Sequence, residues 1–249
     1  MEIIPPESPN DDDSIRFRDC FSVRYIQSAA LLCRLGYRIE QESAGTGRLP
    51  EDRYLCHEAY ILNSLFSSVA FLESTINELW SDAADNAYFY PDKDTELLLR
   101  AIGEKWKNEH FFDRTPMLAK YQKILEIGGK GPFCETDPVF VEVRDLIAVR
   151  NYLMHYRREW VTIPGESGNP PPGTEAGDLR VGKFEMLYSG KFPENPLAPK
   201  KVPYFPDRFL GHGCAEWAVT SALAFTDRFF KVLALSPQYE GILGELKTR

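Results

Sequence analysis

One short segment of the sequence combines residue types and a spacing that suit chemistry on a phosphate group. It reads RNYLMH and runs from Arg150 to His155, with Asn151 directly after the arginine. Histidine side chains accept and release protons near neutral pH, so a histidine can act as a general base or a general acid. A guanidinium can bind two phosphate oxygens and stabilise the negative charge that develops on them. The segment therefore offers proton transfer and charge stabilisation without a metal ion.

A helix predicted over Pro138–Arg158 positions these side chains. At about 100° per residue, its apolar residues form one stripe, the face that a helix buries. The members of this stripe are Val139, Val143, Leu146, Ile147, Leu153 and Met154. Arg150 falls within the stripe, where a buried guanidinium is costly unless it is paired or lines a solvated cleft.

The longest periodic segment, Tyr54–Trp80, contains the opposite exception. Its apolar positions follow a heptad-like spacing through Leu55, Ala59, Leu62, Phe66, Val69, Ile76 and Trp80. Glu73 stands where this pattern requires a hydrophobic residue. Two opposite charges that break the patterns of two amphipathic helices predict that Glu73 and Arg150 meet in the fold.

The motif Arg150-Asn151-x-x-x-His155 resembles the R-(polar)-x-x-x-H signature of the HEPN superfamily, and the resemblance covers about residues 54–235. That family consists of small α-helical domains, many of which are metal-independent endoribonucleases of toxin–antitoxin, antiviral defence and RNA-processing systems. The resemblance implies a homodimer with the active site between two protomers, RNA as the substrate and no cofactor. An antitoxin or sensor protein is a further partner that it implies.

The resemblance also implies the roles of two catalytic residues. His155 would act as general base or acid, because RNA self-cleavage removes a proton from the 2′-hydroxyl and returns one to the 5′-oxygen. Arg150 would stabilise the charged phosphate. Five residues along a helix separate the two side chains by about 140°, which a composite site across a two-fold axis would accommodate. The competing interpretation is structural: Arg150 pairs with Glu73 in the core, and His155 forms a hydrogen bond near the helix end.

Three further residues are candidates for a supporting role. Asn151 lies one helical turn before His155, so it would orient the imidazole or bind phosphate, or it is simply a solvent-exposed residue. Arg144 and Arg157 are candidate contacts to RNA phosphates, although arginines on a helix surface are commonly just solvated. Glu73 would support the site through Arg150 or serve structure alone.

Composition limits the classes of function. The chain has 249 residues and a net charge of −8, which argues against a generally basic protein that coats nucleic acid. The Pro138–Arg158 stretch has four arginines against two acids, which leaves it net +2 and compatible with a local basic cleft. Five scattered cysteines without a C-x-x-C pair predict reduced thiols rather than a disulfide framework or a zinc site.

The start of the chain, MEIIPPESPNDDDS, lacks the apolar core of a signal peptide. The longest uncharged apolar-rich run, between Glu58 and Glu73, has 14 residues and is short for a membrane span. These features predict a cytoplasmic protein without a membrane partner. His57, next to Glu58, is predicted to lie exposed at a helix start.

The domain organisation follows from these patterns. Residues 1–13 are predicted to be a disordered acidic tail, and residues 14–53 an N-terminal helix and linker, with Gly36 ending or interrupting the helix. Residues 54–249 are predicted to form the helical domain, with an irregular Pro- and Gly-rich insert over about 160–206 that lies over the cleft. Within the insert, VGKFEMLYSG is predicted to pair as a short strand or hairpin.

The sequence thus predicts an all-α protein, an up-and-down bundle of about five to seven helices with an excursion before the last long helix. The first functional hypothesis is a metal-independent endoribonuclease. The alternative is a non-catalytic helical module that serves dimerisation or binds a nucleotide or a partner protein.

Overall fold

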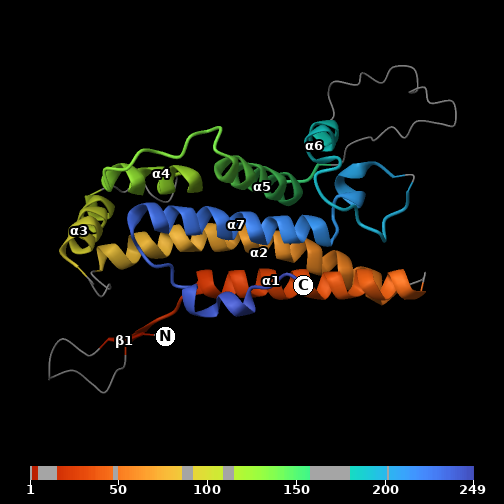
Figure 1. Ribbon diagram of the computed structural model, residues 1–249, viewed down its shortest axis with the longest axis horizontal. Helices are drawn as coiled ribbons and strands as arrows, with labels where there is room; N and C mark the ends of the chain where they lie inside the picture. Colours follow the sequence, from red (N-terminus) through yellow and green to blue (C-terminus); the bar gives the residue numbers. More distant parts are fainter. Residues whose placement is uncertain are drawn as a thin grey trace.

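The computed structural model describes residues 2–4, 16–46, 50–85, 92–108, 115–157, 180–200 and 202–249. Within these ranges the fold is an all-α helical bundle with one pair of short strands (Figure 1). The elements in chain order are β1 Glu2–Ile4, β2 Arg16–Arg18, α1 Phe21–Thr46, α2 Glu51–Ala84, α3 Lys93–Asn108, α4 Met117–Ile127, α5 Pro138–Met154, α6 Arg180–Tyr188, the π-helix η2 Tyr204–Arg208, α7 His212–Leu233 and the 3-10 helix η3 Glu240–Glu245.

Helix α2, with 34 residues, lies at the centre of the bundle. It packs against α1 and α7, which also contact each other, and both α4 and α5 contact α2 as well (Figure 1). The segment between α1 and α2 is short, so the two helices run antiparallel. By length and composition α2 could cross a bilayer, but 44% of its most apolar window is buried within the bundle.

The first helix differs from its prediction in both its start and its continuity. The stretch Arg16–Arg18 pairs as a strand with Glu2–Ile4, antiparallel, with Ile3 opposite Phe17, and the helix begins only at Phe21. Gly36 does not interrupt the helix. A Cβ there would lie 2.6 Å from the Cδ1 of Ile61, so the missing side chain allows α1 and α2 to approach closely.

The buried face of α2 also differs from the predicted heptad stripe in its first half. Leu55 is 59% exposed and Ala59 is exposed, whereas His57, Ile61, Ser64 and Leu65 are buried. Helix α2 has neighbouring helices on several sides, so its buried face is wider than a single heptad stripe. This wider face also contains small polar residues. In α7, small residues followed by larger ones form one buried stripe: Ala215, Ala218, Ala222, Phe225, Phe229 and Leu233.

Part of the predicted irregular insert is helical. The segment predicted to pair as a strand or hairpin forms α6 instead, and it buries Phe184 and Tyr188. Phe184 packs against Phe205 with ring centroids 4.9 Å apart. Phe184 and Tyr188 are four positions apart in the sequence, which is the spacing of one face of a helix rather than of a strand. Residues 160–179 of the same insert lie outside the described residues.

Candidate functional site

The motif occupies the C-terminal end of α5. Asp137 caps the start of this helix, since its side chain accepts a hydrogen bond from the backbone N–H of Val139 at 3.1 Å, and Pro138 holds the first helical position. His155 is the C-cap residue, with φ −107° and ψ 32°, and its N–H donates to the carbonyl of Asn151 at 3.0 Å. The histidine therefore lies just beyond the helix that carries the arginine.

The buried residues of α5 follow a different line from the predicted apolar stripe. They are Phe140, Val143, Leu146, Val149 and Tyr152. A step of three residues turns about 300° around a helix, so this line winds gradually around α5. By the last two turns the buried side has moved to Val149 and Tyr152. Met154, predicted to be in the stripe, is 56% exposed, and Arg150 lies at the edge of the buried side.

Arg150 and Glu73 meet, as their positions in the two patterns predicted. The arginine Nη2 lies 3.8 Å from the glutamate Oε2. The side chains are 24% and 49% exposed, so the pair lies at the surface edge and is not the core ion pair of the competing interpretation. A separation of 3.8 Å exceeds a hydrogen bond, and a partly exposed pair of this kind adds little stability. The guanidinium can therefore exchange this partner for another anion.

The side chains of the other predicted site residues are exposed to solvent. Asn151, His155 and Arg157 are exposed, and so is Arg144, whose Nε lies 3.8 Å from the neighbouring Asp145. Among the described residues no hydrogen bond or ion pair joins Arg150 to His155. A single protomer thus presents the two catalytic candidates separately.

An aromatic cluster fixes the last turn of α5. Tyr152 packs edge-on against Phe184 of α6 and Phe205 of η2, with ring centroids 5.1 and 5.3 Å apart. The ring of Tyr156 packs on the same tyrosine at 5.8 Å. Edge-to-face pairs each contribute about 0.5–1.5 kcal/mol beyond burial. The insert after the motif therefore supports the turn that carries it.

Helix α4 reaches the same part of α2 as Arg150 does. The hydroxyl of Tyr121 donates to the carbonyl of Leu72 at 2.7 Å, and the ammonium of Lys120 donates to the Oδ1 of Asn77 at 2.8 Å. Lys120 is only 5% exposed. Lys120 is not among the candidates predicted from the sequence, although a signal was present: it is a charge in the buried face of α4, beside Met117 and Tyr121.

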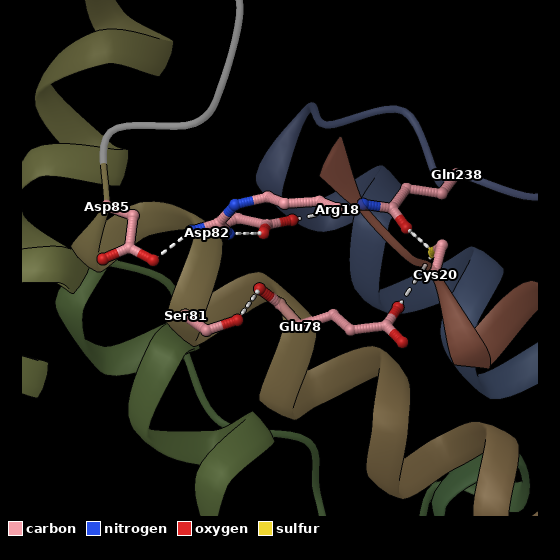
Figure 2. Close-up of polar contacts among 7 residues, drawn as sticks. All are labelled: Arg18, Cys20, Glu78, Ser81, Asp82, Asp85 and Gln238. Atoms are coloured by element: carbon pink, nitrogen blue, oxygen red, sulfur yellow. Dashed lines mark hydrogen bonds and ion pairs between the residues drawn. The ribbon is translucent and has the colours of Figure 1, made fainter. Parts of the chain in front are cut away.

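A second polar cluster joins the N-terminal segment to the last turns of α2 and to Gln238 (Figure 2). Arg18 pairs with Asp82 and Asp85, and the thiol of Cys20 donates to Glu78 at 3.1 Å. Burial, reinforced by the Glu78 carboxylate, raises the pKa of the Cys20 thiol to about 11. A thiol that stays protonated at neutral pH is a weak nucleophile, so this cluster acts as a structural connection.

His57 is the clearest error among the sequence-based expectations. It is fully buried, and its Nε2 lies 2.9 Å from the Oε1 of Glu40. The same Glu40 oxygen accepts the backbone N–H of His212 at 2.6 Å, at the start of α7. The carboxylate thereby satisfies a free N–H at a helix N-terminus, where negative charge is favourable. This cluster connects α1, α2 and α7 inside the fold.

No group of three or more His, Cys, Asp or Glu side chains that could hold a metal ion occurs in the described ranges. The five cysteines are free. Comparison of the chain with protein-family models, with curated proteins and with solved structures gave no match. The function must therefore be argued from the site itself.

Proposed function

We propose that this protein is a metal-independent endoribonuclease, with His155 as general base or acid and Arg150 as the stabiliser of the phosphate. The observation that carries the proposal is the C-terminal end of α5, where the exposed His155 and Arg157 follow directly after the helix that carries Arg150. A histidine that only stabilised the fold would be expected to be buried or bonded, as His57 is.

In the proposed reaction the 2′-hydroxyl of RNA attacks the adjacent phosphorus, and the bond to the 5′-oxygen breaks. His155 of one protomer accepts the hydroxyl proton, and a second histidine, from the partner copy, returns a proton to the leaving oxygen. Arg150 leaves its weak contact with Glu73 and binds the phosphate oxygens as their negative charge increases. The products are a 2′,3′-cyclic phosphate and a free 5′-hydroxyl.

The apolar residues around the motif support a dimer. Met154 and Tyr156 on either side of His155 are 56% and 51% exposed, and Met186 and Leu187 on α6 are 83% and 51% exposed. Exposed large apolar side chains near a polar site are typical of protein contact surfaces. A second copy on this surface would bring two histidines and two arginines together.

The same exposed apolar residues favour a second candidate function, a non-catalytic helical module that binds a second copy or a partner protein. In that case the exposed apolar residues would bind the second protein, and the protein would not cleave RNA. Arg150 would then be a surface ion-pair partner of Glu73.

The test is cleavage of total cellular RNA in the presence of EDTA by the wild type and by His155→Ala. His155 is exposed, so the variant should fold, which circular dichroism checks. General acid–base catalysis contributes about 10²–10⁴-fold, so we expect a loss of cleavage of that size, and wild-type products that end in 2′,3′-cyclic phosphate. Lys130→Ala, an exposed cation in the segment before α5, is the control and should cleave like the wild type.

Equal cleavage by the wild type and His155→Ala would refute the assignment of His155. A dimer that binds no RNA and cleaves none would favour the binding module. Sedimentation of the wild type and of Met186→Asp reports the dimer separately from the chemistry.

A further inference from the structure

Lys120 is a buried cation without a charged partner in the described part of the chain. Its ammonium makes one hydrogen bond there, to the neutral amide oxygen of Asn77 at 2.8 Å, although the residue is only 5% exposed. An ammonium has three N–H donors, and a buried charge is expensive unless an opposite charge or several hydrogen bonds compensate for it. The free donors of Lys120 therefore favour an anion that these residues do not supply.

Helices α4 and α5 bring their charges to one short segment of α2. Lys120 from α4 contacts Asn77, and Arg150 from α5 contacts Glu73. Glu73 and Asn77 are four residues apart, so their side chains are neighbours on one face, with Cβ atoms about 5–6 Å apart. Two cations are thus held on successive turns of the same helix face, against one carboxylate, which leaves one positive charge in excess.

We propose that Lys120, Asn77 and Arg150 form an oxyanion subsite that binds a backbone phosphate of the RNA. This inference rests on the proposed function, since Arg150 is shared with the candidate catalytic site. Lys120 supplies two N–H donors, Asn77 supplies its amide NH₂, and the guanidinium of Arg150 supplies a planar pair. The subsite holds one phosphate of the strand in place relative to His155.

An anion would reach Lys120 from the polar side of α2, with a movement of the lysine head toward that side. Asn77 is partly exposed and Glu73 is 49% exposed, so the polar side of this segment opens to solvent. The four-carbon stem of a lysine can stay covered while its head moves toward water. Glu73 opposes the entry of an anion, because it is the carboxylate that now lies beside Arg150. Removal of its charge should therefore strengthen the subsite.

Inorganic phosphate is the probe, and the measurement is a titration by calorimetry against chloride at equal ionic strength. Lys120→Met keeps the length of the side chain and removes its charge, so we expect phosphate binding to weaken at least about tenfold, the loss of one charge-assisted contact. Glu73→Gln should bind phosphate more tightly than the wild type. Lys123→Met is the matched control, because Lys123 lies on the same helix and pairs at the surface with Glu126 at 3.0 Å.

Phosphate affinity that is the same in Lys120→Met, Lys123→Met and the wild type would overturn the subsite. So would a wild type that binds phosphate no better than chloride.

A second measurement separates this inference from the proposed function. RNA binding by the His155→Ala protein is followed against salt concentration, with and without Lys120→Met. Loss of one phosphate contact should lower the slope of log affinity against log salt by about one. If phosphate binds through Lys120 but RNA is neither bound nor cleaved, the anion subsite stands and the ribonuclease proposal fails. If Lys120→Met cleaves RNA with an unchanged KM, the ribonuclease proposal stands and the anion subsite fails.

Discussion

Replacement of Glu40 by alanine tests whether the buried polar cluster of α1, α2 and α7 stabilises the bundle. In the native protein one carboxylate oxygen serves both the Nε2 of His57, at 2.9 Å, and the backbone N–H of His212, at 2.6 Å. Glu40 is 8% exposed and His57 is 0% exposed. Water therefore cannot readily replace the lost acceptor at the imidazole.

The size of the effect follows from the groups left without a partner. An unsatisfied buried polar group costs about 1–3 kcal/mol, and Glu40→Ala leaves two, so the expected loss is about 2–6 kcal/mol. Loss of the negative charge at the start of α7 adds to this, since such a charge contributes about 0.3–1 kcal/mol, and up to about 2 kcal/mol when partly buried. Against a total stability of about 5–15 kcal/mol, the variant should be strongly destabilised.

The assay is equilibrium unfolding in urea, followed by far-ultraviolet circular dichroism. Glu42→Ala is the matched control: it lies two residues further along α1, and its partner Arg53 is at the surface, so its midpoint should change little. Glu40→Gln retains an acceptor oxygen without the charge, so its unfolding midpoint should lie between those of Glu40→Ala and Glu42→Ala. If Glu40→Ala lowered the midpoint no more than Glu42→Ala does, the reasoning on the buried cluster would be refuted.

Two further predictions concern packing and thiol reactivity. Gly103→Ala should lower the unfolding midpoint in urea, although alanine is the better helix former, because a Cβ there would lie 2.8 Å from the backbone carbonyl carbon of Ala83. Gly131→Ala is the control: a Cβ at that position would have nothing within 4 Å, so the midpoint should not change. Mass spectrometry after iodoacetamide treatment at pH 8 should show Cys134 modified before Cys20, because burial raises the pKa of the Cys20 thiol to about 11, whereas a hydrogen bond from Thr136 lowers the pKa of Cys134. The folded state holds the Cys20 proton more firmly than the unfolded chain does. The contribution of this thiol to the free energy of unfolding is therefore complete below pH 9.0 and is lost as the pH rises toward about 11. A Cys20→Ser variant whose stability declines in the same way at alkaline pH would contradict this.

Local signals in the sequence were sufficient to predict α5 and α7, but they missed the start of α1 and predicted a strand or hairpin where α6 forms. The predicted start of the helix at Pro138 was correct, because capping by Asp137 and the fixed φ of Pro138 depend on a few adjacent atoms. The last long helix, predicted after the insert, is present as α7, since the periodicity of its small and aromatic residues is a property of one helix. The meeting of Arg150 and Glu73 could also be predicted, because each charge violated the pattern of its own helix.

Other features depended on partners far away in the chain and could not be predicted. His57 was predicted to be exposed because it stands next to Glu58 near a helix start, and only the fold brings Glu40 and the start of α7 to it. The buried line of α5 could not be derived from one helix, because it depends on the angles at which α2, α6 and α7 cross α5. The catalytic roles of Arg150 and His155 stay predictions that the RNA cleavage assay tests.

The aromatic cluster around Tyr152 sets an order for the assembly of the motif during synthesis. The ribosome completes α5 before it makes Phe184 and Phe205, the two rings that pack on Tyr152. The helix α7, against which α5 also packs, follows later still. A nascent chain that ends before α7 therefore carries Arg150 and His155 on a turn that has not yet gained its neighbours. The motif therefore gains its full set of neighbours only once the chain through α7 has been made.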